Sequence, residues 1–458
     1  MDNTEVLNTL LSNARTALNE FESYTQEQVD ALIRRVCLDF KAHAEELARE
    51  AVEETGMGNV ESKIAKNRGA ADGIWYSLKG KKSVGIIGYD DVQKMAYVAK
   101  PKGILSSVAP STNPNLTVIF NACFGLKGRN VLIVAPHPGA KKSTLHTVQI
   151  INDSLAAMGA PKNLVQCIEE SSIELTKLLM ENSDVIIATG GANMVRSAYS
   201  SGHPAFGVGP GNVQTIFDRD YDYKLAVEQT VTGRAFDNGL ICACNQSFII
   251  PREAEGEIVG YMKDAKVFYA DDPETVDKFR KAIFPDGHRI NKKVVGQSPV
   301  RVAEIAGVEI PADTSIIVLK LDGTKLGADE PLCAEKLCPV AIEILYDTFE
   351  EAVEIARTNL LFEGAGHSAS IHTNDRKKAE YVGVELPVSR VVVNQPGVFA
   401  ANPALSNGFN PTSTLGCGSW GNNSISENLT YEHLINVSRI GWEKDPENIP
   451  SIEDVWAE

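Results

Sequence analysis

The amino-acid sequence predicts an α/β protein with more than one parallel sheet. The chain has 458 residues, and because a domain usually holds about 150 residues, we expect two or three compact units. From Gly103 onward, short apolar and β-branched segments alternate with segments of helical periodicity, which is typical of a doubly wound sheet covered by helices. A second cycle of this kind begins near Tyr223. The length alone excludes a small disulfide-stapled peptide.

The first hundred residues predict helices followed by a hairpin. Apolar residues recur at helical spacing over residues 5–55, so two or three helices are expected to open the chain. The period then changes, and residues 83–87 and 96–99 are expected to form strands on either side of the polar stretch 88–93. We expect this hairpin to project from the body.

The two α/β cycles can be divided into elements from their periodicity. In the first cycle, the expected strands are 104–108, 131–134, 165–168 and 185–188, and the expected helices are 120–126, 143–158 and 173–181. In the second cycle, the expected strands are 248–250, 316–320, 340–346 and 368–372, and the expected helices are 254–265 and 349–356. The first cycle predicts a nucleotide-binding domain, and the second predicts another α/β domain.

Composition and charge exclude several classes of function. The chain has 44 basic and 60 acidic residues and a net charge of −16, which argues against binding to nucleic acid or to an anionic membrane. No apolar run is long enough for a membrane span, and the first residues do not resemble an export signal, so we expect a cytoplasmic protein. The eight cysteines contain no CxxC pair and the histidines are scattered. We therefore expect reduced thiols and no metal site.

Two segments stand out as candidates for chemistry. Residues 185–192 form an apolar strand that runs into a glycine pair and a helix, where free N–H groups suit a pyrophosphate; a tight turn without a ligand is an equal alternative. Residues 236–247 place Cys242 after a glycine turn and before an apolar strand. Backbone amides that point at a thiol lower its pKa, which favours a nucleophile. The alternative is a core cysteine.

Several longer strings resemble one family. They are FDNGLICACNQS, VIIATGGANMV, YSSGHPAFGVGPGN, EKLCPV, EGAGHSASIHT and SNGFNPTSTLGCGSWGNNSISENLTYEHLINVSRI. The chain resembles the CoA-acylating branch of the aldehyde dehydrogenase superfamily, especially CoA-acylating succinate-semialdehyde dehydrogenases and the aldehyde half of bifunctional aldehyde-alcohol dehydrogenases. The resemblance runs from the first helices almost to the last residue.

The resemblance implies an aldehyde-dehydrogenase-like fold with a Rossmann-like cofactor domain, an α/β catalytic domain and an oligomerisation hairpin. We expect residues 1–222 to hold the opening helices and the dinucleotide-binding domain, with the hairpin at about 82–102. Residues 223–425 are expected to form the catalytic domain. Residues 426–458 are expected to return to the cofactor and oligomer interface. A homodimer or a dimer of dimers is implied.

The resemblance also implies catalytic residues. Cys242 matches the nucleophile, and Asn113 or Thr112 matches the side chain that stabilises the oxyanion together with the Cys242 N–H. His367 matches a histidine that takes the CoA thiol proton; a structural turn histidine is the alternative. In hydrolytic relatives a glutamate that activates water opens an E-L-G-G-K string, and Gly207 stands at that position. Coenzyme A is therefore the expected acceptor.

The cofactor expected from the resemblance is NADP or NAD. Ala135-Pro136-His137-Pro138 replaces the family's K-P-x-E string, which removes an acid that repels a 2′-phosphate, and Lys141 or Lys142 could supply a matching charge. The positions expected to bind the dinucleotide are Pro136, His137, Thr189, Gly190, Gly191, Gly209 and Glu335. Without the resemblance, Glu335 would be interpreted as a surface carboxylate.

The substrate is predicted less sharply. Succinate semialdehyde is favoured by overall similarity, with sulfoacetaldehyde or acetaldehyde as alternatives. Cys244-Asn245 beside the nucleophile and the bulky segment 120–124 depart from relatives. Arg390 could pair with a carboxylate or sulfonate of the substrate, or form an ion pair between domains. A hydrolytic dehydrogenase and a catalytically silent scaffold of the same fold are the rival interpretations.

Overall fold

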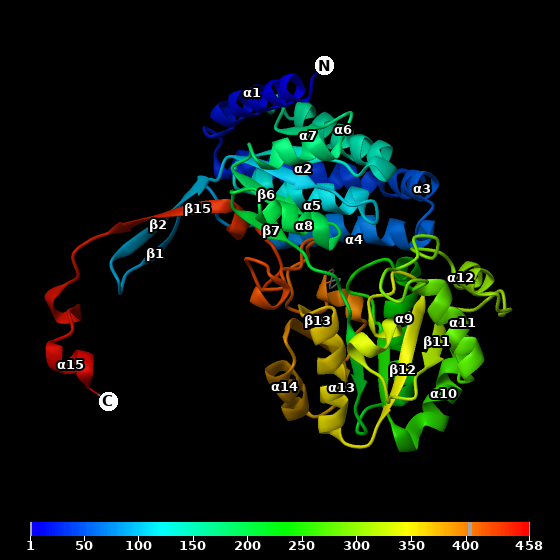
Figure 1. Cartoon of the computed structure of the whole chain (residues 1–458). Coiled ribbons are helices and arrows are strands. Elements are labelled where there is room, and N and C mark those ends of the chain that lie inside the picture. The colour runs from blue at the N-terminus through cyan, green and yellow to red at the C-terminus, as the bar shows by residue number, and fades with distance from the viewer. Residues whose placement is uncertain (1, 402–404, 458) are drawn as a thin grey trace.

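The computed structural model describes residues 2–401 and 405–457 and contains three sheets. A five-stranded and a seven-stranded parallel sheet form the two halves of the body, and a three-stranded antiparallel sheet forms an arm (Figure 1). The predicted α/β fold class is confirmed. All bounds below are those of the described residues.

Four helices open the chain. They are α1 (Asn3–Phe21), α2 (Gln26–Ala42), α3 (Ala44–Thr55) and α4 (Val60–Leu78). Thr25 starts α2 with a capping box, in which its side chain accepts from the Gln28 N–H while the Gln28 side chain accepts from the Thr25 N–H. Gly56 ends α3 at φ 66°, a conformation that glycine adopts without steric cost. The prediction missed α4, because its buried face includes two lysines and an asparagine beside its apolar residues.

The five-stranded sheet has the order β5-β4-β3-β6-β7, the order typical of dinucleotide-binding sheets. Its strands are β3 (Ile104–Val108), β4 (Val131–Ala135), β5 (Val165–Cys167), β6 (Val185–Ala188) and β7 (Ala205–Gly207). Its helices are α5 (Pro114–Lys127), α6 (Lys141–Ala157), α7 (Ile173–Met180) and α8 (Ala192–Tyr199). The strand order reverses between β3 and β6, so the loops after these two strands lie at the position where such sheets bind ligands.

The seven-stranded sheet has the order β10-β11-β12-β9-β8-β13-β14, and its strand pairs are parallel. Its strands are β8 (Gln214–Phe217), β9 (Ser247–Pro251), β10 (Phe268–Ala270), β11 (Ile317–Lys320), β12 (Val340–Tyr346), β13 (Gly366–His372) and β14 (Val388–Val393). Its helices are α9 (Tyr223–Ala235), α10 (Glu255–Asp264), α11 (Pro273–Ile283), α12 (Pro299–Ala306), α13 (Phe349–Phe362) and α14 (Arg376–Glu385). Buried apolar side chains cover both faces of this sheet.

The arm contains the predicted hairpin. Strand β1 (Gly85–Asp90) pairs with β2 (Met95–Pro101), and β2 pairs on its other side with β15 (Ile435–Gly441). The arm extends away from the body, and the short helix α15 (Ile452–Trp456) lies near its far end (Figure 1). The chain segment after residue 426 therefore returns to the hairpin.

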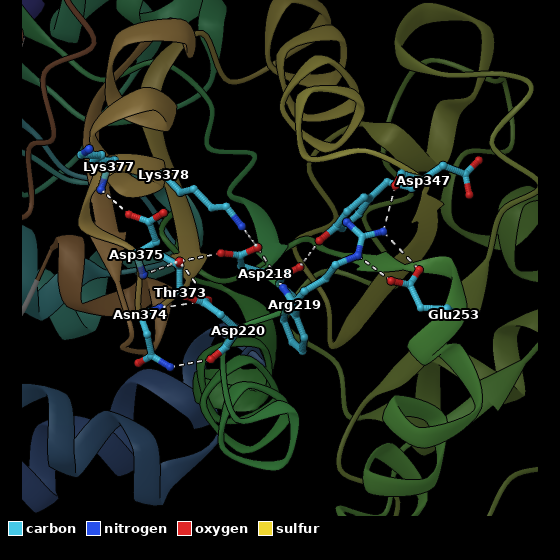
Figure 2. Close-up of polar contacts among 12 residues, drawn as sticks. Asp218, Arg219, Asp220, Glu253, Asp347, Thr373, Asn374, Asp375, Lys377 and Lys378 are labelled. Carbon is cyan, nitrogen blue, oxygen red and sulfur yellow. Dashed lines mark hydrogen bonds and ion pairs between the residues drawn. The ribbon is translucent and has the colours of Figure 1, made fainter.

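At the carboxyl end of the seven-stranded sheet, charged side chains bond to one another (Figure 2). After β8, Asp218 accepts from Lys378 Nζ at 2.6 Å and from Thr373 Oγ1 at 2.7 Å. Arg219 donates to the carboxylate of Glu253 and, at 2.8 Å, to the backbone carbonyl of Asp347. The carboxyl end of a parallel sheet is the usual ligand site, but internal partners occupy these groups here.

Among the residues that the structure describes, no helix combines the length and the apolar character that crossing a membrane requires.

Candidate active site

The candidate nucleophile lies at the amino end of β9, close to the link between the two sheets. Cys242 follows a short 3-10 turn (Phe236–Gly239), in which Asp237 and Asn238 have φ angles of 52° and 55°. The Cys242 side chain is partly exposed. Gly211, in the link between β7 and β8, packs directly on its backbone, and a Cβ at that position would overlap the Cys242 carbonyl. The strained turn and this close approach hold Cys242 between the sheets.

The pKa of the Cys242 thiol differs from the prediction. Burial raises it well above its ordinary value, and Glu335 adds to this effect when it is ionised. This direction is opposite to the predicted lowering of the pKa. Backbone amides were expected to stabilise the thiolate, but the largest influences on this thiol are burial and Glu335, with no backbone hydrogen bond among them.

Two hydrogen-bond donors are available near Cys242. In the described part of the chain, no acceptor lies within bonding distance of the Cys242 backbone N–H. Asn113, at the N-cap of α5, accepts a 2.5 Å hydrogen bond at Oδ1 from Lys66 Nζ. Its amide nitrogen makes only a long 3.5 Å contact with Thr112 Oγ1. The Asn113 amide N–H groups therefore remain free for another acceptor.

Glu335 lies between the glycine link and a second carboxylate. Its Oε1 accepts from the Gly211 N–H at 3.2 Å, and its own N–H donates to Glu363 Oε2 at 2.6 Å. Burial raises the pKa of Glu335 to about 8, and the charge of Glu363 contributes. Glu335 is thus largely protonated at neutral pH and changes charge just above it.

His367 is fully buried at the start of β13. Neither ring nitrogen has a hydrogen-bond partner among the described residues. Burial lowers the pKa of His367 to about 3, and the positive charge of Arg390 adds to the shift. The imidazole is therefore neutral at physiological pH. Buried polar atoms without partners are rare, so these two nitrogens mark a position where a ligand group can bond.

Arg390 does not fit either of its predicted roles. Its side chain is buried on β14 and donates to Ser368, to Asn428, and to the backbone carbonyls of His367 and Gly416. Each of its three nitrogens has a protein acceptor, so no edge is left for a substrate carboxylate. It forms no ion pair with any described carboxylate within 4.0 Å either. Instead, it ties the segment around residues 416–428 to β13.

The loop after β6 fits the pyrophosphate of a dinucleotide. Thr189 has a buried hydroxyl oxygen without a partner in the described chain. Gly190 and Gly191 are exposed immediately before α8. Because β6 is the neighbour of β3, this loop lies at the same end of the sheet as Asn113. An orphaned hydroxyl beside exposed backbone N–H groups is the donor set that a phosphate requires.

The positions expected to bind the adenosine end are partly occupied by protein contacts. Pro136 is buried, and His137 accepts from the Gly139 N–H at 3.0 Å. Lys141 pairs with Glu170 and Lys142 pairs with Glu50. Both lysines predicted to bind a 2′-phosphate are therefore already in ion pairs. In addition, Glu54 accepts from the backbone N–H groups of Lys142 and Ser143 at the start of α6.

Gly207 is crowded, whereas Gly209 has only ordinary van der Waals contacts. A Cβ at Gly207 would lie 2.6 Å from Val195 Cγ1 and 2.9 Å from Tyr199 Cε2. A glutamate side chain does not fit there without displacement of α8. Gly209, predicted to bind the cofactor, lies against Cys417, whose Sγ would be 3.6 Å from a Cβ at that position.

Sequence reasoning missed three buried charged residues near this site. Lys63, Lys66 and Asp237 are each at most 4% exposed and are joined by ion pairs. The only sequence signal was a pair of lysines three residues apart, which also fits an ordinary solvent-exposed helix face.

Comparison with known proteins identifies the family. The model of the aldehyde dehydrogenase family matches residues 2–276. The chain is 50% identical to acetylating succinate-semialdehyde dehydrogenase of Clostridium kluyveri, over 100% of both chains. It is 37% identical to sulfoacetaldehyde dehydrogenase of an Acholeplasma species, over 98% of this chain and 93% of that relative. The chain superimposes on the crystal structure of an acetylating aldehyde dehydrogenase from Geobacillus thermoglucosidasius with a TM-score of 0.93. The match covers 98% of each chain at 36% identity. The chain therefore belongs to the aldehyde dehydrogenase family, in its CoA-acylating branch.

Proposed function

We propose that this enzyme interconverts a small aldehyde, CoA and NAD(P)⁺ with an acyl-CoA and NAD(P)H through a thioester on Cys242. The favoured pair is succinate semialdehyde and succinyl-CoA, supported by 50% identity over the whole chain to an acetylating succinate-semialdehyde dehydrogenase. Sulfoacetaldehyde is the second candidate, supported by the more distant sulfoacetaldehyde dehydrogenase. Acetaldehyde is the third.

The observation that carries the choice of CoA is the crowding at Gly207. Hydrolysis of the thioester needs a base that activates water. The position of that base holds a glycine whose Cβ would already contact Val195 and Tyr199. Water is then a poor acceptor for the acyl group, and a thiol is the better nucleophile.

In the aldehyde-oxidising direction, the Cys242 thiol gives its proton to solvent and its sulfur bonds to the aldehyde carbon, so the carbonyl oxygen becomes an oxyanion. The Cys242 N–H and the Asn113 amide are the donors assigned to this oxygen. Thr189 and the two glycines after it would hold the pyrophosphate of the dinucleotide, and Glu335 would contact the nicotinamide ribose. A bound nicotinamide would take the former aldehyde hydrogen as a hydride while the oxyanion returns to a carbonyl, which would leave the acyl group on Cys242 as a thioester; in the reverse direction it would supply the hydride.

The second half-reaction transfers the acyl group from Cys242 to CoA. The CoA sulfur bonds to the thioester carbon and the Cys242 sulfur leaves. We assign the proton of the CoA thiol to His367, because its imidazole is neutral and its ring nitrogens have no partner among the described residues. The lowered pKa makes His367 a weaker general base than a free imidazole, because a general base works best when its pKa lies near the operating pH.

The test is the absorbance of reduced nicotinamide. Purified protein is mixed with NADPH or NADH and with succinyl-CoA, acetyl-CoA or sulfoacetyl-CoA in turn. We expect oxidation that is fastest with succinyl-CoA and that is abolished in Cys242→Ala, with the circular dichroism spectrum unchanged. Acid formation from the aldehyde without CoA would indicate the hydrolytic rival. No oxidation with any acyl-CoA, from folded and reduced protein, would favour the scaffold.

We also propose that the protein is a cytoplasmic homodimer or dimer of dimers. The arm supports the oligomer, because β1 and β15 are the unpaired edges of its sheet and such edges readily pair with another chain. Eight free cysteines support a reducing compartment.

A further inference from the structure

A buried charge cluster joins the opening helices to the turn before the nucleophile. Lys63 and Lys66 lie one turn apart on α4, and Asp237 lies in the turn that precedes Cys242. Asp237 Oδ2 accepts from Lys63 Nζ at 3.1 Å and from Lys66 Nζ at 2.5 Å. Its Oδ1 accepts from the Asn59 N–H at 3.1 Å. Two lysines and one carboxylate leave a net positive charge in this buried position.

Lys66 has a second acceptor that Lys63 lacks. Lys66 Nζ also donates to Asn113 Oδ1 at 2.5 Å. An ammonium group carries only donors, so it can bond to the oxygen of an amide but not to the nitrogen. This contact therefore fixes which way the Asn113 amide faces, with Oδ1 toward Lys66 and Nδ2 turned away from it.

We propose that Lys66 is the positioning residue of the oxyanion site: it holds the Asn113 amide so that Nδ2 can donate to the substrate oxygen, and Asp237 anchors Lys66 to the turn that precedes Cys242. The inference rests on the proposed function, because it requires that Asn113 donates to an oxyanion. Without Lys66, the amide can rotate and present its oxygen, which repels an oxyanion.

The charge balance allows this role to be separated from a structural one. Removal of either lysine leaves Asp237 paired with the other, so neither change leaves a buried carboxylate without a cation. Lys63→Met and Lys66→Met thus remove comparable ion pairs from the same carboxylate. Only Lys66→Met removes a contact with Asn113, which makes Lys63→Met the matched control.

The experiment measures kcat and KM for acyl-CoA reduction in the wild type, Lys66→Met, Lys63→Met, Asn113→Ala and the double variant Lys66→Met/Asn113→Ala. Loss of one oxyanion donor lowers kcat by roughly 100-fold or more, so we expect a drop of about 100-fold in Asn113→Ala. We expect about 30-fold in Lys66→Met with little change in KM, and less than about threefold in Lys63→Met. In the Asn113→Ala background, Lys66→Met should lower kcat by less than about threefold further, because both changes remove the same interaction.

Alkylation of Cys242 by iodoacetamide provides a second readout. This reaction forms a carbon–sulfur bond without an oxyanion, so its rate should be similar in wild type, Lys63→Met and Lys66→Met. If Lys66→Met does not fold, Lys66→Gln replaces it, because the glutamine amide is one bond shorter and cannot reach both acceptors of Nζ. The same loss of kcat is expected.

Three outcomes would overturn the inference. Equal loss of kcat in Lys63→Met and Lys66→Met would indicate a structural role. Additive losses in the double variant would show that Lys66 does not act through Asn113. A parallel loss of alkylation would place its effect on the thiol. If the wild type itself reduces no acyl-CoA, the proposed function fails and this inference fails with it.

Discussion

The Cys242 thiol is held protonated at neutral pH. Burial is the main cause, and the charge of Glu335 is the next. Since Glu335 itself has a pKa raised to about 8 by burial and by Glu363, its charge changes just above neutral pH. The reactivity of Cys242 should therefore depend on the ionisation of Glu335 as well as on its own.

We expect Glu335→Gln to speed the alkylation of Cys242 by iodoacetamide at alkaline pH. Above about pH 8, Glu335 is negative and opposes formation of the thiolate, whereas glutamine stays neutral. At pH 9 the variant should react on the order of threefold faster than the wild type, which corresponds to a decrease of half a unit in the pKa of the Cys242 thiol. Below pH 7 the two rates should converge. Identical pH profiles would show that Glu335 has no influence on the thiol.

His372 is a second buried histidine that the proposed mechanism does not use. Its Nε2 lies 3.1 Å from Thr230 Oγ1, and its ring packs edge-on against Phe217 with centroids 5.2 Å apart. Burial lowers the pKa of His372 to about 3, from about 6.5 in an unfolded chain. Between about pH 3 and pH 6.5, His372 is therefore protonated in the unfolded state and neutral in the folded state. As the pH falls through this range, the equilibrium shifts toward the unfolded protein.

We expect His372→Gln to reduce the acid sensitivity of folding. The stability linked to neutral His372 is fully present above pH 6.5 and is lost as the pH falls toward 3. Between pH 6 and pH 4, the free energy of unfolding decreases as the pH falls. This decrease should be smaller in the variant than in the wild type, by about 1.4 kcal/mol per pH unit. Urea unfolding at several pH values measures this slope. The exposed His288→Gln is the control, and equal slopes in His372→Gln and wild type would contradict the assignment.

At the scale of elements, Glu54 links α3 to the start of α6. Its carboxylate accepts from the N–H groups of Lys142 and Ser143 at 2.7 and 2.8 Å, and from Ser143 Oγ at 2.6 Å. A negative charge at a helix N-terminus is favourable, because the first N–H groups have no partner within the helix. Glu54 thus caps α6 from a helix almost ninety residues earlier in the chain.

We expect Glu54→Ala to lower the free energy of unfolding by about 1–2 kcal/mol, the usual cost of a lost helix cap. Thermal unfolding followed by circular dichroism measures the change. Glu53→Ala is the matched control, because Glu53 is the exposed neighbour of Glu54 on the same helix. A similar loss in both variants would mean that α3 is weakened in general and that the contact with α6 contributes little.

At the same scale, the interior strands were predicted more accurately than those nearer the sheet edges. Strands β3, β6 and β12 have the predicted bounds, because continuous apolar runs are typical of strands buried on both faces. The prediction missed β7, β10 and β14, which are short or lie at a sheet edge. It also missed β8, whose sequence Gln-Thr-Ile-Phe is half polar. Inside the protein, the Gln214 side chain donates to the Asn212 carbonyl and the Thr215 hydroxyl accepts from Asn245.

At the scale of the whole molecule, the carboxyl end of the five-stranded sheet meets the amino end of the seven-stranded sheet. Asn113 follows β3, Cys242 precedes β9, and Lys66 bonds to both Asn113 and the turn before Cys242. The opposite end of the larger sheet is filled by the ion pairs around Asp218 (Figure 2). The site thus uses the ligand-binding end of one sheet only.

We expect the arm to form the contact between two copies of the chain. Exposed apolar side chains gather on and beyond it, including Trp442 at 54% and Trp456 at 81% exposure. Light scattering of the wild type should give at least twice the chain mass of 49.6 kDa. The variant Trp442→Glu/Trp456→Glu should shift toward that single-chain mass, because it places charges in an apolar contact.

The control for the arm is a double variant of the body. Ile173 and Val384 are 85% and 80% exposed on α7 and α14. Ile173→Glu/Val384→Glu should leave the mass unchanged. A wild-type mass of one chain would disprove the proposed oligomer.

The sequence by itself determined the alternation of strands and helices, the place of Cys242 before β9, and the glycine at position 207. These features depend on neighbouring residues or on strings shared with a family, so they can be recognised without contacts. Only the tertiary structure decided the raised pKa of Cys242, the internal bonds of Arg390 and the cluster that orients Asn113. Burial and electrostatic fields arise from residues such as 66, 113 and 237, which are far apart in the chain and meet only when it folds.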